Sequence, residues 1–240
     1  MSELATALAG AVDPVALARR AGIEPDPWQQ RALRSTAGQQ LWLCCRQAGK
    51  SLTAAILATH TAATTPGATV LLVSPSQRQS TELMHAVKGV LRYLDRPTQE
   101  AETKVTLANG SRIISLPGTE GTIRGYSAHL LVIDEAAQVP DDTYAAVRPL
   151  LAVTNGRLVA LTTPHGARGW FHEAWRDGSG WERTRVPATD VPRISAAFLA
   201  DERAALGERT YKQEYELEWM ESAGSLWRAD QIERMFDGGW

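Results

Sequence analysis

The tripeptide Gly49-Lys50-Ser51 does most to limit how this chain can fold. It follows an apolar run at residues 41–45 and precedes residues 51–64, which are apolar at helical spacing. A strand, a glycine-containing loop and a helix in this order are typical of a phosphate-binding loop. The glycine lets the backbone approach a phosphate closely, and the first helical turn offers free N–H groups. The sequence therefore predicts an α/β domain with a P-loop.

The loop residues have separate expected tasks. Lys50 is expected to reach the β- and γ-phosphates of ATP, and the Ser51 hydroxyl is expected to ligate Mg²⁺. Cys44 stands where the general pattern has its first glycine, so the loop departs from that pattern. A chance Gly-Lys-Ser in an ordinary loop is the alternative, which the strand and helix on either side disfavour. The other loop residues expected at the nucleotide are Arg46, Gln47, Ala48 and Gly49.

A second expected strand, residues 130–134, is apolar up to Ile133 and closes with the two carboxylates Asp134 and Glu135. A strand that is apolar throughout is buried on both faces in a parallel sheet, and its carboxyl end opens onto the ligand crevice. There Asp134 can hold Mg²⁺ opposite Ser51, and Glu135 can orient and activate the attacking water. Asp134 could instead cap a helix that begins near Pro140. The presence of both motifs in one chain favours ATP hydrolysis.

Apolar runs and helical patterns alternate along the chain, which predicts an α/β domain with a mostly parallel sheet flanked by helices. Together with the phosphate-binding loop and the acidic strand, this resembles a P-loop NTPase of the RecA (ASCE-like) type. Asn109-Gly110 between two alternating segments predicts a hairpin at one side of the sheet. We divide the chain into an ATPase core (residues 1–190), a small lid-like helical subdomain (191–221) and a linker (222–240) toward a further domain. The other expected strands are residues 69–74 and 157–162, and the other expected helices are residues 77–94, 196–206 and 208–220.

The composition argues against several other kinds of protein and site. Cys44 and Cys45 are adjacent, so on a strand they point to opposite faces and are poorly placed to bridge each other, which favours a reduced, intracellular protein. The apolar runs are too short to cross a bilayer, and residues 1–22 lack the apolar stretch of a signal peptide. The five histidines have no zinc-ligand spacing with the cysteines. A formal net charge of −2 does not decide whether the chain binds nucleic acid.

The order and spacing of these motifs resemble the ATPase domain of the large terminase subunit, the motor that packages DNA into tailed-phage capsids. The resemblance covers residues 27–220. Residues 46–51, with an early arginine and no first glycine, resemble that family's variant P-loop, and residues 130–137 resemble its acidic strand. Residues 161–166 look like its coupling motif, and residues 211–215 like the end of its ATPase region.

The resemblance implies an ATPase that uses ATP and Mg²⁺ to translocate double-stranded DNA into a procapsid. It implies a homo-oligomeric ring on the capsid portal, the small terminase subunit as a partner, and the cytoplasm of an infected bacterial cell as the location. Large terminases also carry a nuclease domain of the RNase H type. The scattered carboxylates after Glu216 do not form its acidic two-metal site, so we expect no DNA cleavage by this chain.

The resemblance also implies roles for single residues. Trp28 and Gln29 resemble the adenine-recognition element, and the amide of Gln29 suits the N6/N7 edge of adenine. Thr162 and Thr163 look like the γ-phosphate sensor, because a hydroxyl can exchange a hydrogen bond when the phosphate leaves. Arg124 resembles an arginine finger, which is worth a rate factor of about 10³–10⁵. A solvated glutamine, a strand-end threonine pair and an exposed loop arginine are the respective alternatives.

DNA contact is expected from a modest basic set, although a solvated helix face explains the same residues. The basic set comprises Lys88, Arg92, Arg96 and Lys104.

Arg46 has a separate expected role at the nucleotide. Its guanidinium can bridge a phosphate and a neighbouring carboxylate.

Two other functions stay open from the residues. A RecA-like domain of a superfamily 2 DNA helicase has a similar motif set, but such a helicase needs a second RecA-like domain, and 240 residues leave no room for it. A nucleotide-dependent assembly or clamp module that hydrolyses ATP slowly is the third possibility.

Overall fold

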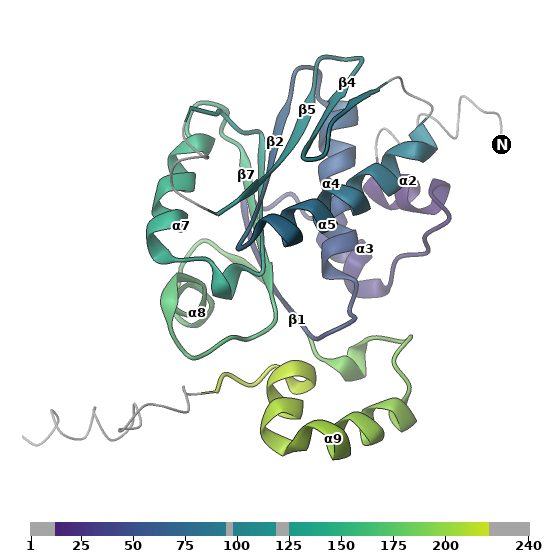
Figure 1. Cartoon of the computed structure of the whole chain (residues 1–240), viewed down its shortest axis with the longest axis vertical. Helices are drawn as coiled ribbons and strands as arrows, with labels where there is room; N and C mark the ends of the chain where they lie inside the picture. Colours follow the sequence, from purple (N-terminus) through teal and green to yellow (C-terminus); the bar gives the residue numbers. More distant parts are fainter. Residues whose placement is uncertain (1–12, 95–97, 119–124, 221–240) are drawn as a thin grey trace, which may run out of the picture.

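The apolar runs form the parallel centre of a mixed sheet, because their side chains are buried on both faces. The computed structural model describes residues 13–94, 98–118 and 125–220 (Figure 1). Within these residues the sheet order is β3-β4-β5-β2-β6-β7-β1-β8; the β3–β4 and β4–β5 pairings are antiparallel, and the other pairings are parallel. The strands are β1 (Gln39–Cys44), β2 (Thr69–Ser74), β3 (Thr98–Glu100), β4 (Lys104–Leu107), β5 (Arg112–Pro117), β6 (Leu130–Asp134), β7 (Arg157–Thr162) and β8 (Glu182–Val186).

Helices cover both faces of the sheet, with α2, α3, α4 and α5 on one side and α7 and α8 on the other (Figure 1). Helix α4 is apolar almost all round because it packs on the sheet as well as on α2, α3 and α5. The helices are α2 (Pro14–Arg20), α3 (Pro27–Arg34), α4 (Lys50–Thr64), α5 (Gln77–Leu91), α7 (Asp141–Val147), α8 (Gly169–Arg176) and α9 (Ala196–Tyr211), with 3-10 turns at Arg92–Leu94, Ala136–Gln138, Arg148–Leu151 and Ala188–Asp190 and a π-helix at Lys212–Glu216. Within the part of the chain that the structure describes, none of the helices combines the length and apolarity needed to cross a bilayer.

The strand order brings three segments together that are distant in the sequence. Strand β7 lies between β1 and β6, with Leu43 opposite Thr162 and Asp134 opposite Leu161. Because these strands are parallel, their carboxyl ends meet at one edge of the sheet. The loop after β1, the threonine pair at the end of β7 and the carboxylate pair at the end of β6 therefore share this edge.

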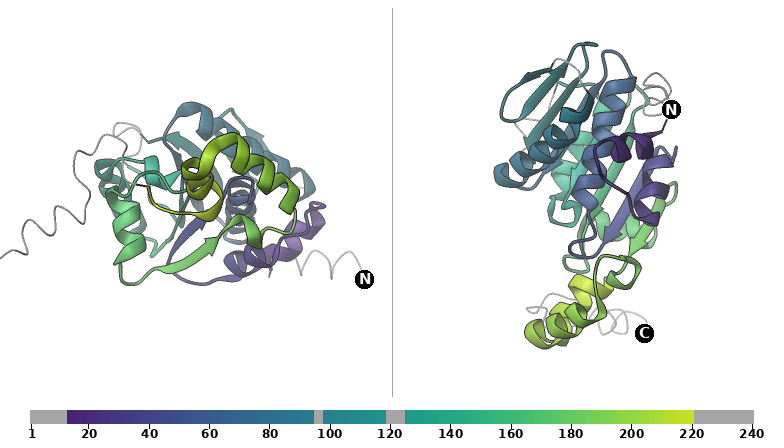
Figure 2. Two further views of the ribbon diagram at one scale, coloured as in Figure 1. Left: turned by 90° about the horizontal axis from the view of Figure 1, so that it is seen from below. Right: turned by 90° about the vertical axis from the view of Figure 1, so that its right-hand side faces the viewer.

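Helix α9 and the π-helix lie beyond this edge of the sheet, below the strands in Figure 1 and in front of them in the left view of Figure 2. The backbone N–H of Arg46 donates to the carbonyl oxygen of Glu214 (3.1 Å), so this C-terminal segment touches the loop after β1. Trp219 then returns to α8, where its ring lies against Phe171 and His172. The division of the chain at residue 191 stays a prediction.

Several predicted elements have their expected bounds. Strands β2, β6 and β7 match, and β4 and β5 form the antiparallel hairpin around Asn109-Gly110. The helix expected to reach residue 220 ends at Glu216, because Leu217 has a left-handed backbone (φ 64°). The helix expected to reach residue 94 ends at Leu91 and continues as a 3-10 turn. Strand β8 was not predicted, because it is an edge strand with exposed charged side chains and no apolar alternation.

Candidate nucleotide-binding site

The loop after β1 bends sharply without the usual first glycine. Cys44 remains in β1, paired with Val186 of β8, and is fully buried, so the turn begins only after it and needs no glycine there. Two later residues have left-handed backbones, Gln47 (φ 60°) and Gly49 (φ 87°). Any side chain at Gly49 would be strained by this backbone conformation, and its Cβ would lie 2.9 Å from the Nε2 atom of Gln29, so the Gln29 amide would have to shift.

Lys50 and Glu135 form an ion pair, with Nζ 3.1 Å from Oε1. Glu135 has a left-handed backbone (φ 48°) directly after β6, an uncommon conformation for a non-glycine residue and one often associated with functional sites. Burial lowers the pKa of Lys50, but the charges of Glu135 and Asp134 outweigh this and hold its pKa above the ordinary value. Lys50 is therefore a cation near neutral pH.

Asp134 lies beside Ser51 at the same edge. The Ser51 hydroxyl donates to Oδ2 of Asp134 (3.1 Å), and the backbone N–H of Glu135 donates to Oδ1 (2.9 Å). Burial, and next the charge of Glu135, raise the pKa of Asp134 to about 6. The site thus places two carboxylates and one ammonium group in little solvent. At neutral pH its net charge is negative.

These side chains suit a magnesium ion and a triphosphate. A hydroxyl and a carboxylate, both oxygen ligands, lie side by side in Ser51 and Asp134, and a cation there would offset the unbalanced negative charge. Helix α4 begins at Lys50 with Gly49 as its N-cap, and no side chain of the described residues caps its first turn, so its N–H groups remain to bind phosphate. Ser51 and Asp134 would hold the ion, and Lys50 would meet the phosphates.

The threonine pair connects to the acidic motif by hydrogen bonds. The buried Thr162 hydroxyl accepts from the backbone N–H of Ala137 (3.3 Å) and donates to the carbonyl oxygen of Thr163 (2.8 Å). The end of β7 is therefore tied to the turn that follows Glu135.

The segment expected to recognise adenine packs against the loop. Gln29 is 4% exposed: its Oε1 accepts from the N–H of Asp26 (2.7 Å), and its Nε2 donates to Oγ1 of Thr53 (2.8 Å). Trp28 is buried edge-on against Trp42, so it supports α3 from the core side. Both polar ends of the Gln29 amide are already paired within the chain. Its role toward adenine stays a prediction.

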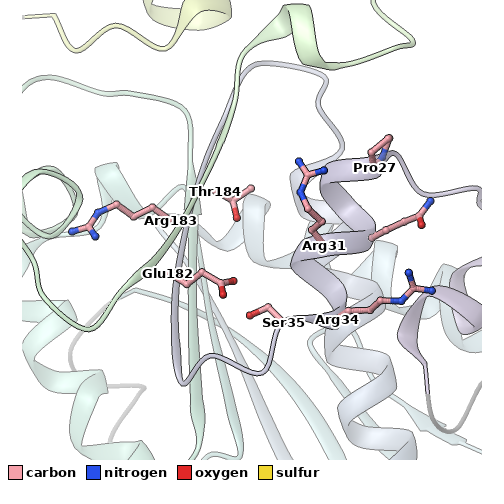
Figure 3. Close-up of a pocket in the computed structure, with 8 residues that line it drawn as sticks. Pro27, Arg31, Arg34, Ser35, Glu182, Arg183 and Thr184 are labelled. Carbon is pink, nitrogen blue, oxygen red and sulfur yellow. The ribbon is translucent and has the colours of Figure 1, made fainter.

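A cleft of about 660 Å³ opens on the outer face of α3, between this helix and β8 (Figure 3). Of its three arginines, Arg34 pairs with Asp13 (2.7 Å), and Arg183 donates to main-chain oxygens such as that of Trp175 (2.8 Å). Two of the three guanidinium groups are thus engaged by the chain itself.

A second cleft, of about 580 Å³, adjoins the turn after Glu135. Its lining comprises Ala137, Gln138, Val139, Pro140, Asp141, His165, Arg168 and Gly169.

Two residues that contact the loop were missing from the sequence-based site. Glu214 pairs with Arg46 (Nε to Oε2, 3.0 Å), and so provides a carboxylate of the kind expected beside Arg46. Arg193 donates to the carbonyl oxygen of Ala48 (3.1 Å). The two contacts join residues that lie 168 and 145 positions apart in the sequence, so no pattern of neighbouring residues predicts them.

The predicted DNA-contacting residues lie elsewhere or are not described. Lys88 donates to the carbonyl oxygen of Ala101 (2.7 Å), and Arg92 and Lys104 are exposed. Lys104 is on β4, near the antiparallel edge of the sheet, five positions from β1. Arg96 and the expected finger Arg124 fall outside the described residues.

Comparison with known proteins agrees with this arrangement. The family model described as the N-terminal region of the T4-like-virus type of terminase large subunit matches residues 42–234. The large terminase ATPase domain of Thermus phage P74-26 is similar in fold (TM-score 0.76, 22% identity); the match covers 85% of this chain and 97% of that domain. The large terminase of another thermophilic bacteriophage, solved with ATP-gamma-S, has a TM-score of 0.70 at 13% identity, and 81% of this chain matches 53% of that one. For the HK97 bacteriophage large terminase the TM-score is 0.67 at 14% identity, with 80% of this chain and 50% of that one covered.

Proposed function

This chain belongs to the terminase large subunit family of the T4-like-virus type, and from that membership we propose that it is the ATPase motor that drives double-stranded DNA into a procapsid. One observation supports the proposal most: the Lys50–Glu135 and Ser51–Asp134 contacts bring both motifs to one edge of the sheet. The family match does not favour the helicase alternative.

The ion pair suggests how hydrolysis depends on binding. Without nucleotide, Lys50 neutralises Glu135 at 3.1 Å. The phosphates of ATP compete for the ammonium group, and Glu135 is then free to orient a water molecule against the γ-phosphate and accept its proton. Ser51 and Asp134 would hold Mg²⁺, which would neutralise charge on the phosphates. Attack by this water yields ADP and inorganic phosphate.

Release of phosphate would be sensed at the neighbouring strand end. The hydroxyl of Thr162 links β7 to the turn after Glu135, so a shift of this turn alters the hydrogen bonds of Thr162 and Thr163. We assign the relay toward the DNA-gripping surface to this link. A bistable element biased by a single hydrogen bond is enough for such a relay.

The assembly of the motor is part of the same proposal. Arg124 is proposed as the finger that reaches the ATP of a neighbouring subunit, within a homo-oligomeric ring on the portal. The small terminase subunit is the proposed partner, and the cytoplasm of the infected bacterium the proposed location. These assignments come from the family resemblance.

The catalytic part is tested by turnover. Phosphate release by the purified chain should require Mg²⁺ and rise with double-stranded DNA, and Lys50→Ala should lower it by at least about 100-fold. Lys212→Ala, which removes a partly exposed lysine from the C-terminal segment, is the matched control and should hydrolyse normally. Undiminished hydrolysis by a folded Lys50→Ala variant would refute the proposed site.

The ring is tested by mixing two inactive variants. Arg124→Ala lacks the finger and Glu135→Ala lacks the base, so a mixed ring contains interfaces with both groups intact. Recovery of activity on mixing supports action between subunits. No recovery would contradict the trans finger, and binding of ATP without DNA-stimulated turnover would favour the slow clamp module.

A further inference from the structure

Arg193 lies between β8 and α9 and contacts two other segments of the site. Its Nη2 atom is 2.7 Å from Oδ2 of Asp26 and donates to the carbonyl oxygen of Ala48 at 3.1 Å. Its side chain is 54% exposed, whereas that of Asp26 is 8% exposed. One guanidinium group therefore connects the segment before α9, the start of α3 and the phosphate-binding loop.

The contact with Asp26 continues into the adenine segment. Asp26 caps α3 in a capping box with Gln29, whose Oε1 accepts from the N–H of Asp26. Gln29 in turn donates to Thr53, and the Thr53 hydroxyl donates to the carbonyl oxygen of Gly49 (2.9 Å). Arg193 and Thr53 thus hold two successive carbonyl groups of the loop, those of Ala48 and Gly49.

Holding these carbonyl groups fixes the neighbouring N–H groups. In a planar trans peptide the C=O and N–H bonds point in opposite directions. The hydrogen bond from Arg193 to the Ala48 oxygen therefore sets the direction of the Gly49 N–H. The bond from Thr53 does the same for the Lys50 N–H. N–H groups that already point toward a phosphate need no reordering when it binds.

We propose that Arg193 is a positioning residue of the ATP site: it presets the Gly49 N–H for phosphate and, through Asp26, locks the adenine segment to the loop. This inference rests on the proposed function for its ligand. A simple surface ion pair is the competing explanation, and such pairs contribute little. An ordinary ion pair would leave phosphate affinity unchanged, so the two explanations differ in what they predict for binding.

The experiment measures binding by calorimetry with ATP and with inorganic triphosphate, which lacks the adenosine. Arg193→Ala should weaken both ligands by about fivefold or more, because the loop must order its own peptide group. Arg193→Lys should not restore binding, since an ammonium group cannot reproduce the guanidinium fork that spans Asp26 and Ala48. Arg19→Ala, which removes an exposed ion pair with Glu24, is the control and should bind normally.

The outcomes separate the alternatives. Normal affinity of Arg193→Ala for inorganic triphosphate, with a wild-type melting temperature, would overturn the positioning role. Normal triphosphate binding by Arg193→Lys would overturn the positioning role as well. The lysine variant therefore tests the role even if the alanine variant does not fold. If wild-type protein binds inorganic triphosphate but never hydrolyses ATP, the proposed function fails while this inference is still tested.

Discussion

Replacing Asp134 by asparagine should make the nucleotide-free protein more stable at pH 7 while abolishing hydrolysis. The carboxylate is 6% exposed, and its burial and the charge of Glu135 disfavour ionisation. Asparagine removes the charge but keeps both hydrogen bonds. Its oxygen can accept from the N–H of Glu135, and its NH₂ can donate to the Ser51 hydroxyl, which rotates to accept.

The size of the effect follows from the pKa of Asp134. This pKa lies at about 6 in the folded chain, against a reference value of 3.8. Because the folded pKa is raised, the folded state loses stability as the pH climbs from about 4 to about 6, where the unfolded chain ionises first. Above pH 6 the full penalty is about 3 kcal/mol. Asp134→Asn should recover about 1–3 kcal/mol at pH 7 and almost nothing below pH 4.

Denaturant titration at pH 4 and pH 7, without Mg²⁺ or nucleotide, measures this difference. Asp142→Asn is the control: Asp142 is an exposed carboxylate in the first turn of α7, and its replacement should cost less than about 1 kcal/mol. Asp134→Asn that is less stable than wild type at pH 7, or equally stabilised at both pH values, would refute the electrostatic account of the site. Added Mg²⁺ with an ATP analogue should reduce the stability difference between Asp134→Asn and wild type at pH 7. Only the wild-type carboxylate binds the ion, so only wild type is stabilised by it.

Three further predictions concern the loop, the base and the core. Glu135→Gln should lower turnover by at least about 100-fold yet bind ATP at least as tightly as wild type, because Lys50 loses its competing partner; phosphate release and calorimetry measure the two. Gly49→Ala should lower the melting temperature and weaken nucleotide binding, because its φ of 87° and the 2.9 Å approach to Gln29 Nε2 both oppose a Cβ; equal melting temperatures would contradict this. Leu131→Ala should cost about 2–5 kcal/mol of unfolding free energy in a denaturant titration, since Leu131 is fully buried in β6, and a loss below about 1 kcal/mol would contradict its place in the core.

Features with a local pattern could be predicted from the sequence. Strand β6 is apolar without interruption, and its bounds matched; the hairpin followed from Asn109-Gly110. Strand β8 has the sequence Glu-Arg-Thr-Arg-Val, and only its pairing with β1 makes it a strand. Tertiary pairing overrode local preference there. The prediction of where the C-terminal helix ends was wrong for a similar reason, because the left-handed residue after it is Leu217 and not a glycine.

In the site, too, residues within a local motif could be predicted from the sequence, whereas residues that contact the loop from distant segments could not. Lys50 and Glu135 belong to motifs that can be read from a few neighbouring residues, and parallel topology alone brings such motifs to one edge. The orientation of each loop peptide depends instead on partners far along the chain, such as Arg193 on the Ala48 carbonyl. Losing the Arg193 bond to the Ala48 carbonyl would leave the neighbouring N–H of Gly49 without a fixed direction, although every motif would be unchanged. Arg193 could therefore be identified only once its contacts with Asp26 and Ala48 were visible in three dimensions.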